Sequence, residues 1–189
     1  AGTMVPSLEK IYPGIEVHGV ELDPAIVDLG RRHLGLKLPD ENIHTMDARA
    51  FVQNTQLSFD IVIADAYRPP TIPQHLASLE FFHSLRTIMT DESILLLNYS
   101  GVFHQHSVAQ TLHKTMEQAF ETVDSFRLLS SVNSALVAFK GSRFTREPTL
   151  PWMPQDTTFD ASVEVLTDDQ NSIEILQELD MIRYAFSKL

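Results

Sequence analysis

The chain has 189 residues, of which 43% are hydrophobic and 21% are charged, as is ordinary for a soluble globular domain with a sizeable core. No apolar run approaches the roughly 20 residues that span a bilayer and no signal-peptide pattern is present, so we expect a cytoplasmic protein without a membrane partner. The lack of cysteine excludes disulfides and thiolate metal sites, and the net charge of -11 argues against a nucleic-acid partner, which would need a basic groove.

Helical and extended patterns alternate along the first three quarters of the chain. A nearly all-apolar run at residues 61–64 is typical of a strand that a parallel sheet buries on both faces. In chain order, the patterns predict helices at 4–11, 24–34, 48–54, 76–89 and 107–119, and strands at 17–22, 42–46, 61–64, 94–98, 123–129 and 135–140. This alternation predicts an α/β fold, in which helices flank a mostly parallel sheet that an antiparallel strand closes.

The alternation stops after residue 141. Residues 142–161 carry prolines around Trp152 and are interpreted as an extended arm, while apolar spacing predicts a final helix at 173–186. We therefore expect one nucleotide-binding catalytic domain at 1–141, with the arm and the helix of 142–189 packed on it.

Three predicted strands each run into an acidic residue, namely Glu21, Asp47 and Asp65. In open α/β sheets, ligands bind outside the carboxyl ends of the strands. A carboxylate such as Glu21 can accept both hydroxyl protons of a ribose, and Asp47, beside the small Ala48, can accept from the exocyclic amine of adenine. The alternatives are local, because Glu21 could only solvate a strand end and Asp47 could be the N-cap of the helix at 48–54.

Asp65 follows the apolar run at 61–64 and precedes a loop that contains prolines. Low-dielectric surroundings at the end of a buried strand would amplify the proton affinity of this carboxylate and its attraction for a cation. A catalytic acid/base or amine-holding group is expected at such a position. The alternative is a structural aspartate that accepts hydrogen bonds from loop amides.

The runs GVELDPAIVDLGRRHLGL, MDARAF and FDIVIADAYRPPTIPQHL, with VLTDD near the carboxyl end, resemble the spermidine synthase-like aminopropyltransferases. Members of this family have the Rossmann-like fold of class I S-adenosylmethionine-dependent methyltransferases. The resemblance covers most of residues 2–141. It implies that Glu21 binds the ribose of the donor, that Asp47 with Ala48 binds its adenine, and that Asp65 is the catalytic aspartate.

The resemblance also implies a reaction and its partners. An aminopropyl group would pass from decarboxylated S-adenosylmethionine to an amine such as putrescine, as in polyamine biosynthesis. The donor is then a substrate, no tightly bound cofactor is expected, and the family suggests a homodimer. Two alternatives stay open: a methyltransferase that uses S-adenosylmethionine, and a catalytically inactive nucleotide-binding module.

The loop after Asp65 departs from the family pattern. Spermidine synthases carry a second aspartate three positions after the catalytic one, and Arg68 occupies that place here. A fixed cation disfavours a dicationic acceptor, so Arg68 either points to solvent or favours an acceptor that carries a carboxylate or phosphate. Tyr67 lines the acceptor pocket or packs the loop, and His75 has a pocket-lining or helix-entry role.

A second departure concerns the start of the family's nucleotide unit. The first strand and most of the glycine-rich turn have no counterpart here, so Gly2 would be the remaining donor-binding residue of that turn. Without a central strand, its two neighbours would keep unpaired backbone groups, each costing about 1–3 kcal/mol. We therefore expect the chain to be a piece of a longer polypeptide.

Two further pairs of polar residues are discounted. His104 and His106 have a spacing that could serve a metal, but no acidic third ligand is evident, and we expect no metal site. Asp168 and Asp169 precede the final helix and are expected to cap it.

Overall fold

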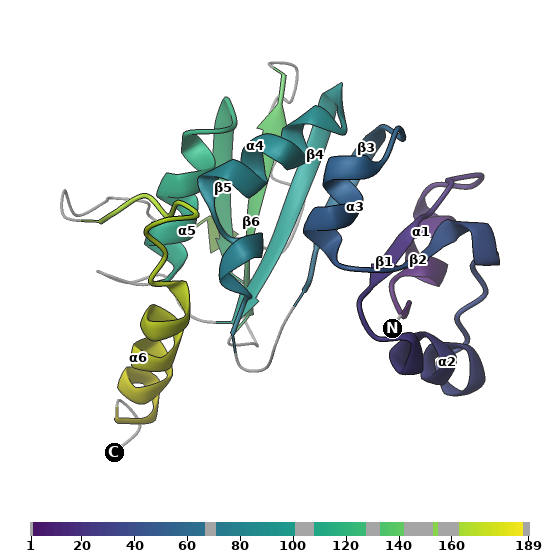
Figure 1. Cartoon of the computed structure of the whole chain (residues 1–189), viewed down its shortest axis with the longest axis horizontal. Helices are drawn as coiled ribbons and strands as arrows, with labels where there is room; N and C mark the ends of the chain where they lie inside the picture. The colour runs from purple at the N-terminus through teal and green to yellow at the C-terminus, as the bar shows by residue number, and fades with distance from the viewer. Residues whose placement is uncertain are drawn as a thin grey trace. The chain divides into compact units, whose positions relative to one another are not determined.

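The computed structural model of the chain describes residues 2–66, 71–100, 108–127, 133–141, 153–154 and 163–186. The chain divides into two compact units, Ala1–Thr55 and Gln56–Leu189, which are described separately below (Figure 1). The division falls inside the predicted domain of residues 1–141, and that domain assignment stays a prediction.

The first unit is built on two short parallel strands. Its elements are α1 (Val5–Ile11), β1 (Gly19–Glu21), α2 (Pro24–His33), the 3₁₀ helix η1 (Asp40–Asn42), β2 (Ile43–Thr45) and α3 (Ala48–Asn54). β1 pairs with β2 so that Glu21 lies opposite Thr45. The predicted start of α2 is confirmed, because the side chain of Asp23 accepts a hydrogen bond from the Ala25 amide at 2.8 Å and Pro24 is the first helical residue.

The second unit holds a five-stranded sheet in the order β3-β4-β6-β5-β7. Its elements are β3 (Phe59–Ala64), η2 (Gln74–Leu76), α4 (Leu79–Thr87), β4 (Met89–Ser100), α5 (Val108–Glu117), β5 (Thr122–Arg127), β6 (Asn133–Lys140), β7 (Met153–Pro154) and α6 (Ile173–Phe186). β3 and β4 are parallel, whereas β6 runs antiparallel to both β4 and β5. Helices and a sheet that combines parallel strands with the reversed strand β6, which lies between β4 and β5, confirm the predicted fold class.

The helix predicted at 76–89 is shorter than expected. The segment first forms η2, and α4 then begins after Ser78, whose hydroxyl accepts a hydrogen bond from the Phe81 amide at 3.3 Å. The predicted last residue, Met89, is instead the first residue of β4 and pairs with Phe59. Pairing between distant strands therefore overrides the local helical pattern at this boundary.

The two faces of the five-stranded sheet are buried to different extents. Leu95, Leu97 and Tyr99 alternate along one face of β4 and are 0–3% exposed, whereas Leu96 and Asn98 on the other face are half-buried. β3, which we expected to be buried on both faces, is half-buried over most of its length. Its sequence suits a central strand, but among the described residues it pairs with β4 alone.

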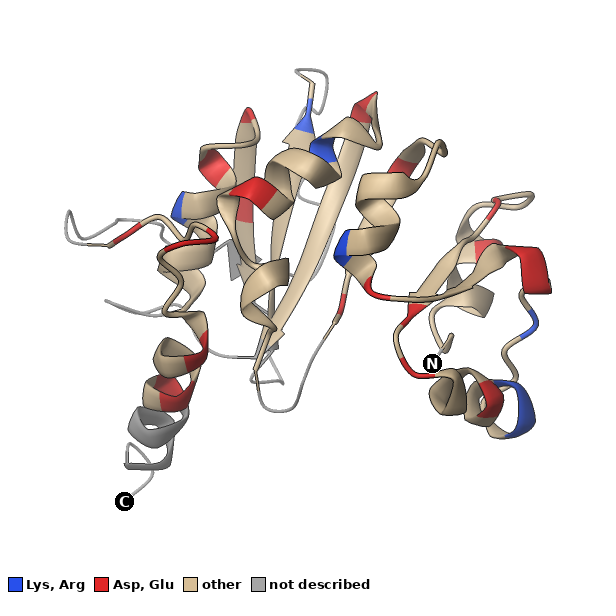
Figure 2. Cartoon of the chain, viewed as in Figure 1, with Lys and Arg blue, Asp and Glu red and all other residues tan. Residues whose placement is uncertain are grey.

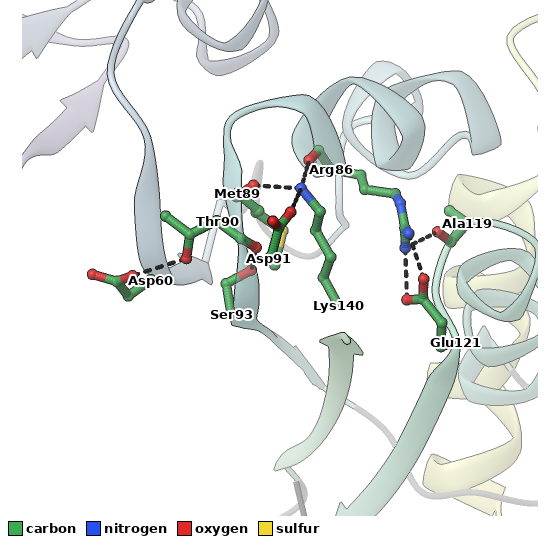
Figure 3. A network of polar contacts seen from close by, with 9 residues as sticks. All are labelled: Asp60, Arg86, Met89, Thr90, Asp91, Ser93, Ala119, Glu121 and Lys140. Atoms are coloured by element: carbon green, nitrogen blue, oxygen red, sulfur yellow. Dashed lines mark hydrogen bonds and ion pairs between the residues drawn. The ribbon is translucent and has the colours of Figure 1, made fainter. Parts of the chain in front are cut away.

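A network of polar contacts lies at the end of the sheet opposite Asp65, where β4 and β5 begin and β6 ends (Figure 3). The Arg86 guanidinium donates to both carboxylate oxygens of Glu121 and, at 3.0 Å, to the Ala119 carbonyl. The Lys140 ammonium donates to the Met89 carbonyl at 2.5 Å. These contacts tie α4 to the segment that precedes β5, and the start of β4 to the end of β6.

The segment before α6 packs on α4. The Leu79 amide donates to the Leu166 carbonyl at 2.8 Å, and the Ser78 hydroxyl donates to the Asp168 carboxylate at 2.6 Å. The Asp168 amide in turn donates to Glu80 at 2.9 Å. Asp168 therefore serves the start of α4, and the expectation that it caps the final helix is wrong.

Among the described residues, acidic side chains are spread over many elements. Figure 2 shows acidic residues on many elements of both units, in keeping with the formal net charge of -11. Charge alone therefore does not locate a binding surface. In the part of the chain that the structure describes, no helix has the length and apolar character needed to cross a membrane.

Candidate functional site

Two of the three predicted acidic strand ends lie side by side in the first unit. Glu21 is the last residue of β1 and lies opposite Thr45, the last residue of β2. The Met46 amide donates to the Glu21 carbonyl at 3.1 Å, and Asp47 is the next residue along the chain. The Glu21 carboxylate accepts from the Asp23 amide at 3.1 Å. Parallel pairing of β1 and β2 therefore brings these carboxylates to one edge, as a nucleoside site requires.

Asp47 also has the local role that was its alternative. Its carboxylate accepts from the Ala50 amide at 3.0 Å and caps α3. Capping employs one carboxylate oxygen, and a carboxylate can accept several hydrogen bonds. Ala48 is the first residue of α3 and is half-buried. The cap therefore holds the carboxylate and Ala48 in a defined position at the end of β2.

Gly2 lies in the turn that leads into α1. Its φ of +74° is in the left-handed region, and a Cβ at this position would lie 2.4 Å from Leu36 Cδ1. The Gly2 carbonyl accepts from the Val5 amide at 3.2 Å. Only glycine fits this backbone without strain. Nothing in this geometry tests whether Gly2 contacts a donor, which stays a prediction.

Asp65 follows β3 in the second unit and is held by a residue of the neighbouring strand. Ala64 pairs with Leu97, and the Asn98 side-chain amide donates to the Asp65 carboxylate at 2.7 Å. Asp65 itself is exposed, so the expected low-dielectric surroundings are not found within this unit. Its carboxylate is thus oriented by Asn98 and open to a ligand, which suits a group that must accept a proton.

Sequence reasoning missed Asn98. The residue follows the apolar run at 94–97 as Asp65 follows the run at 61–64, so a search for polar residues of any charge at strand ends would have found it. An amide at this position can donate to Asp65 without changing the net charge of the site.

The residues predicted for the acceptor side are only partly described. Tyr67 and Arg68 lie outside the described residues, as do His104 and His106. His75 is exposed in η2. Within the described ranges, no three His, Asp or Glu side chains approach one another closely enough to hold a metal ion.

A shallow pocket of about 250 Å³ lies beside α3, lined by His44, Met46, Phe51, Asn54 and Thr55. The His44 ring lies 4.6 Å from that of Phe51, and a hydrogen bond of 3.2 Å joins its Nε2 to His18 Nδ1. Burial, and secondarily the charge of His18, lower the pKa of His44. Neither Glu21 nor Asp47 lines this pocket, although Met46, which does, directly precedes Asp47.

The family model for the spermine/spermidine synthase domain matches residues 7–138. The chain belongs to this family. That range includes Glu21, Asp47 and Asp65, so the spermine/spermidine synthase match contains all three acidic strand ends. The family resemblance expected from the sequence motifs is confirmed.

Two curated relatives of the chain are named as polyamine aminopropyltransferases. A probable polyamine aminopropyl transferase of Bifidobacterium longum is 29% identical over 120 residues, covering 63% of this chain and 27% of that protein. A polyamine aminopropyltransferase of Vibrio vulnificus is 30% identical over 103 residues, covering 51% and 34% of the two chains. The chain thus spans about a third or less of the length of these relatives.

Solved structures confirm the fold. A probable spermidine synthase from Corynebacterium glutamicum aligns with a TM-score of 0.64 at 22% identity, covering 79% of this chain and 57% of that one. Human methyltransferase-like protein 13, in complex with SAH, aligns with a TM-score of 0.64 at 18% identity, covering 78% and 72% of the two chains. At these identities the alignments show the shared Rossmann-like methyltransferase fold alone.

Proposed function

We propose that the protein transfers an aminopropyl group from decarboxylated S-adenosylmethionine to an amine acceptor. The observation that carries this proposal is the match of the spermine/spermidine synthase model across residues 7–138, which contains all three acidic strand ends. Relatives named polyamine aminopropyltransferase support the reaction class. A solved spermidine synthase that bears the transition-state analogue AdoDATO has the same fold, with a TM-score of 0.61 at 16% identity over 95% of this chain and 62% of that one.

In this proposal the first unit binds the nucleoside. Glu21 accepts the two ribose hydroxyl protons, and the Asp47 carboxylate accepts from the adenine amine. Ala48 leaves room for the ring. The parallel pairing of β1 and β2 supports these roles, because it holds the two carboxylates at one edge.

Asp65 serves the acceptor. A neutral amine attacks the carbon next to the sulfonium, the carbon–sulfur bond breaks, and its electron pair converts the sulfonium into the neutral thioether of methylthioadenosine. The attacking nitrogen becomes positively charged and passes one proton to the Asp65 carboxylate. The hydrogen bond of 2.7 Å from Asn98 keeps the Asp65 side chain in place while its other oxygen stays available.

Arg68 bears on which amine is the acceptor. A cation in place of the family's second aspartate disfavours a dicationic amine such as putrescine, and it favours an amine that also carries an anionic group. The acceptor panel should therefore contain both kinds of amine. A methyltransferase from Emericella nidulans, named N-terminal histidine N-methyltransferase, is 28% identical over 123 residues, so S-adenosylmethionine belongs in the donor panel.

The test combines donor binding with turnover. We expect calorimetric titration to show binding of decarboxylated S-adenosylmethionine and methylthioadenosine, and we expect methylthioadenosine to be released when an amine is added. Asp65→Asn should lower kcat at least about 100-fold, the lower end of a general base contribution, without changing donor affinity. Asp60→Asn, at the other end of β3, is the matched control and should leave turnover unchanged. Full turnover in Asp65→Asn, or exclusive use of S-adenosylmethionine, would contradict the proposal.

A further inference from the structure

The pocket beside α3 adjoins a relay of three hydrogen-bonded side chains, Glu16, His18 and His44. The Glu16 carboxylate lies 3.0 Å from His18 Nε2, and His18 Nδ1 lies 3.2 Å from His44 Nε2. The Glu16 side chain is 74% exposed and that of His18 is 10% exposed, so the relay leads from solvent into the first unit. His44, at its inner end, is one of the residues that line the pocket.

The proton positions on the two histidines follow from the carboxylate. An ionised carboxylate only accepts hydrogen bonds, so His18 Nε2 carries a proton, and the other nitrogen of a neutral His18 is then an acceptor. His44 Nε2 therefore donates to His18, which leaves His44 Nδ1 as the unprotonated ring nitrogen. The two rings are 13° from parallel with their centroids 5.5 Å apart, which suits rings joined edge to edge by an N–H···N hydrogen bond.

The surroundings of His44 preserve this acceptor. Burial, and secondarily the charge of His18, lower the pKa of His44, so its ring stays neutral. Within the described ranges Nδ1 has no hydrogen-bond partner, and it is not one of the buried polar atoms that lack a partner, so a molecule from solvent can reach it. The relay thus leaves an accessible nitrogen acceptor on a ring that lines the pocket.

The other walls of the pocket suit an aromatic ring with a polar edge. Phe51 is 7% exposed, and its ring lies 4.6 Å from that of His44. Met46 supplies a thioether, which makes favourable contacts with aromatic rings. Asn54 and Thr55 add an amide and a hydroxyl at the end of α3. Apolar walls with a few polar groups are typical of small-molecule sites.

The volume of the pocket limits the size of its ligand. Pockets for drug-sized ligands measure about 300–1,000 Å³, and a cavity of about 150 Å³ holds one benzene ring. At about 250 Å³, this pocket has room for one substituted ring or for two fused rings.

We propose that this pocket binds a small planar aromatic molecule that carries an O–H or N–H group on its ring, as phenols and indoles do. The ring packs against Phe51 and Met46, and its O–H or N–H group donates to His44 Nδ1. Glu16 and His18 set the acceptor without touching the ligand. The site is additional to the proposed aminopropyl transfer and does not rest on it, because no residue of the relay or the pocket has a role in that reaction.

The first experiment reads the relay by NMR of the ¹⁵N-labelled chain, since long-range ¹H–¹⁵N correlations show which ring nitrogen carries the proton. At pH 8 we expect the proton on Nε2 in both His18 and His44. In Glu16→Ala the constraint on His18 is lost and its tautomers should mix, whereas Glu9→Ala, which removes an exposed carboxylate from α1, is the matched control and should change neither ring. A proton on His44 Nδ1 of the unmodified chain would overturn the proposal.

The second experiment titrates the chain with phenol and with anisole, which has the same ring but no donor, and follows the amide signals of residues 44–55. Phenol should bind about 2- to 10-fold more tightly, the value of one hydrogen bond. His44→Phe keeps an aromatic wall and removes the acceptor, so the two compounds should then bind equally. Equal binding of both to the unmodified chain, or no binding of phenol, contradicts the proposal whether or not the variant folds.

Methylthioadenosine distinguishes this site from the proposed nucleoside edge. An excess of methylthioadenosine should leave the affinity for phenol unchanged, and displacement of phenol would assign the pocket to the nucleoside and overturn the proposal. If the chain binds no donor and transfers nothing to any amine, the proposed aminopropyl transfer fails. The comparison of phenol with anisole still decides separately whether the pocket and the relay form a site.

Discussion

The ion pair between Glu121 and Arg86 provides a test of how the second unit is held together. The hydrogen bond from Arg86 lowers the pKa of Glu121 from 4.5 to about 2. A carboxylate with a depressed pKa in the folded state contributes stability that is fully present above about pH 4.5 and is lost as the pH falls toward 2. We therefore choose Glu121→Gln, which keeps the shape of the side chain and removes its charge.

The expected loss of unfolding free energy depends on how far the two side chains of the ion pair are exposed to solvent. A shift from 4.5 to about 2 corresponds to roughly 3.4 kcal/mol if solvent screened none of it. The Arg86 and Glu121 side chains are 32% and 45% exposed, so water and salt reduce this value strongly. Because the ion pair is bidentate and Arg86 also donates to the Ala119 carbonyl, we expect the pair to contribute about 1 kcal/mol to the free energy of unfolding, the upper end of the range for surface ion pairs.

The assay is urea unfolding followed by circular dichroism at pH 7 and pH 2.5. Glu121→Gln should lower the free energy of unfolding by about 1 kcal/mol at pH 7 and by much less at pH 2.5. Asp91→Asn is the control, because Asp91 belongs to the same network but its side chain is fully exposed and lies 3.8 Å from Lys140 (Figure 3). An effect of Glu121→Gln that is equal at both pH values, or equal to that of Asp91→Asn, would refute the reasoning.

Two further predictions test local features, one on glycines and one on a histidine. Gly141→Ala should lower the free energy of unfolding in urea by about 2–3 kcal/mol, because φ is +106° and the new Cβ would lie 2.4 Å from the Asp91 carbonyl oxygen. The control is Gly14→Ala, where φ is +85° but the space around the new Cβ is open, so the loss should be only about 1 kcal/mol. Equal losses for the two variants would contradict the steric argument. Because the pKa of His44 is lowered, its protonation favours the unfolded chain as the pH falls through 6.5. His44→Phe should therefore lose less stability between pH 7.5 and 5.5 than the unmodified chain, and identical losses would show that His44 is not responsible.

The starts of α2 and α3 were predictable because their signals are local. Pro24 begins α2 as predicted, and the helix predicted at 48–54 matches α3 in both bounds. The N-cap hydrogen bond joins residues only two or three positions apart, so the signal lies in adjacent letters. The sequence allowed Asp47 to be interpreted as either an N-cap or a ligand-binding residue, because a capping carboxylate can accept a second hydrogen bond.

Helix and strand boundaries that depend on contacts with residues distant in the sequence were not predictable from local signals. Met89 ends a helical pattern but begins β4, because it pairs with Phe59 across 30 positions of sequence. Asp168 precedes the final helix yet bonds to Ser78, at the start of α4. Both residues have acceptable local roles, and the tertiary fold selects another one that local spacing does not contain.

By itself, the sequence determined the α/β class, the starts of α2 and α3 and the placement of Glu21, Asp47 and Asp65 at strand ends, because alternation and capping depend on residues within a few positions of one another. Only the tertiary structure decided that Asn98 orients Asp65 and that Gln177 reaches the Ile72 amide. These contacts join residues 33 and 105 positions apart. Such pairs form only once the sheet and α6 are assembled.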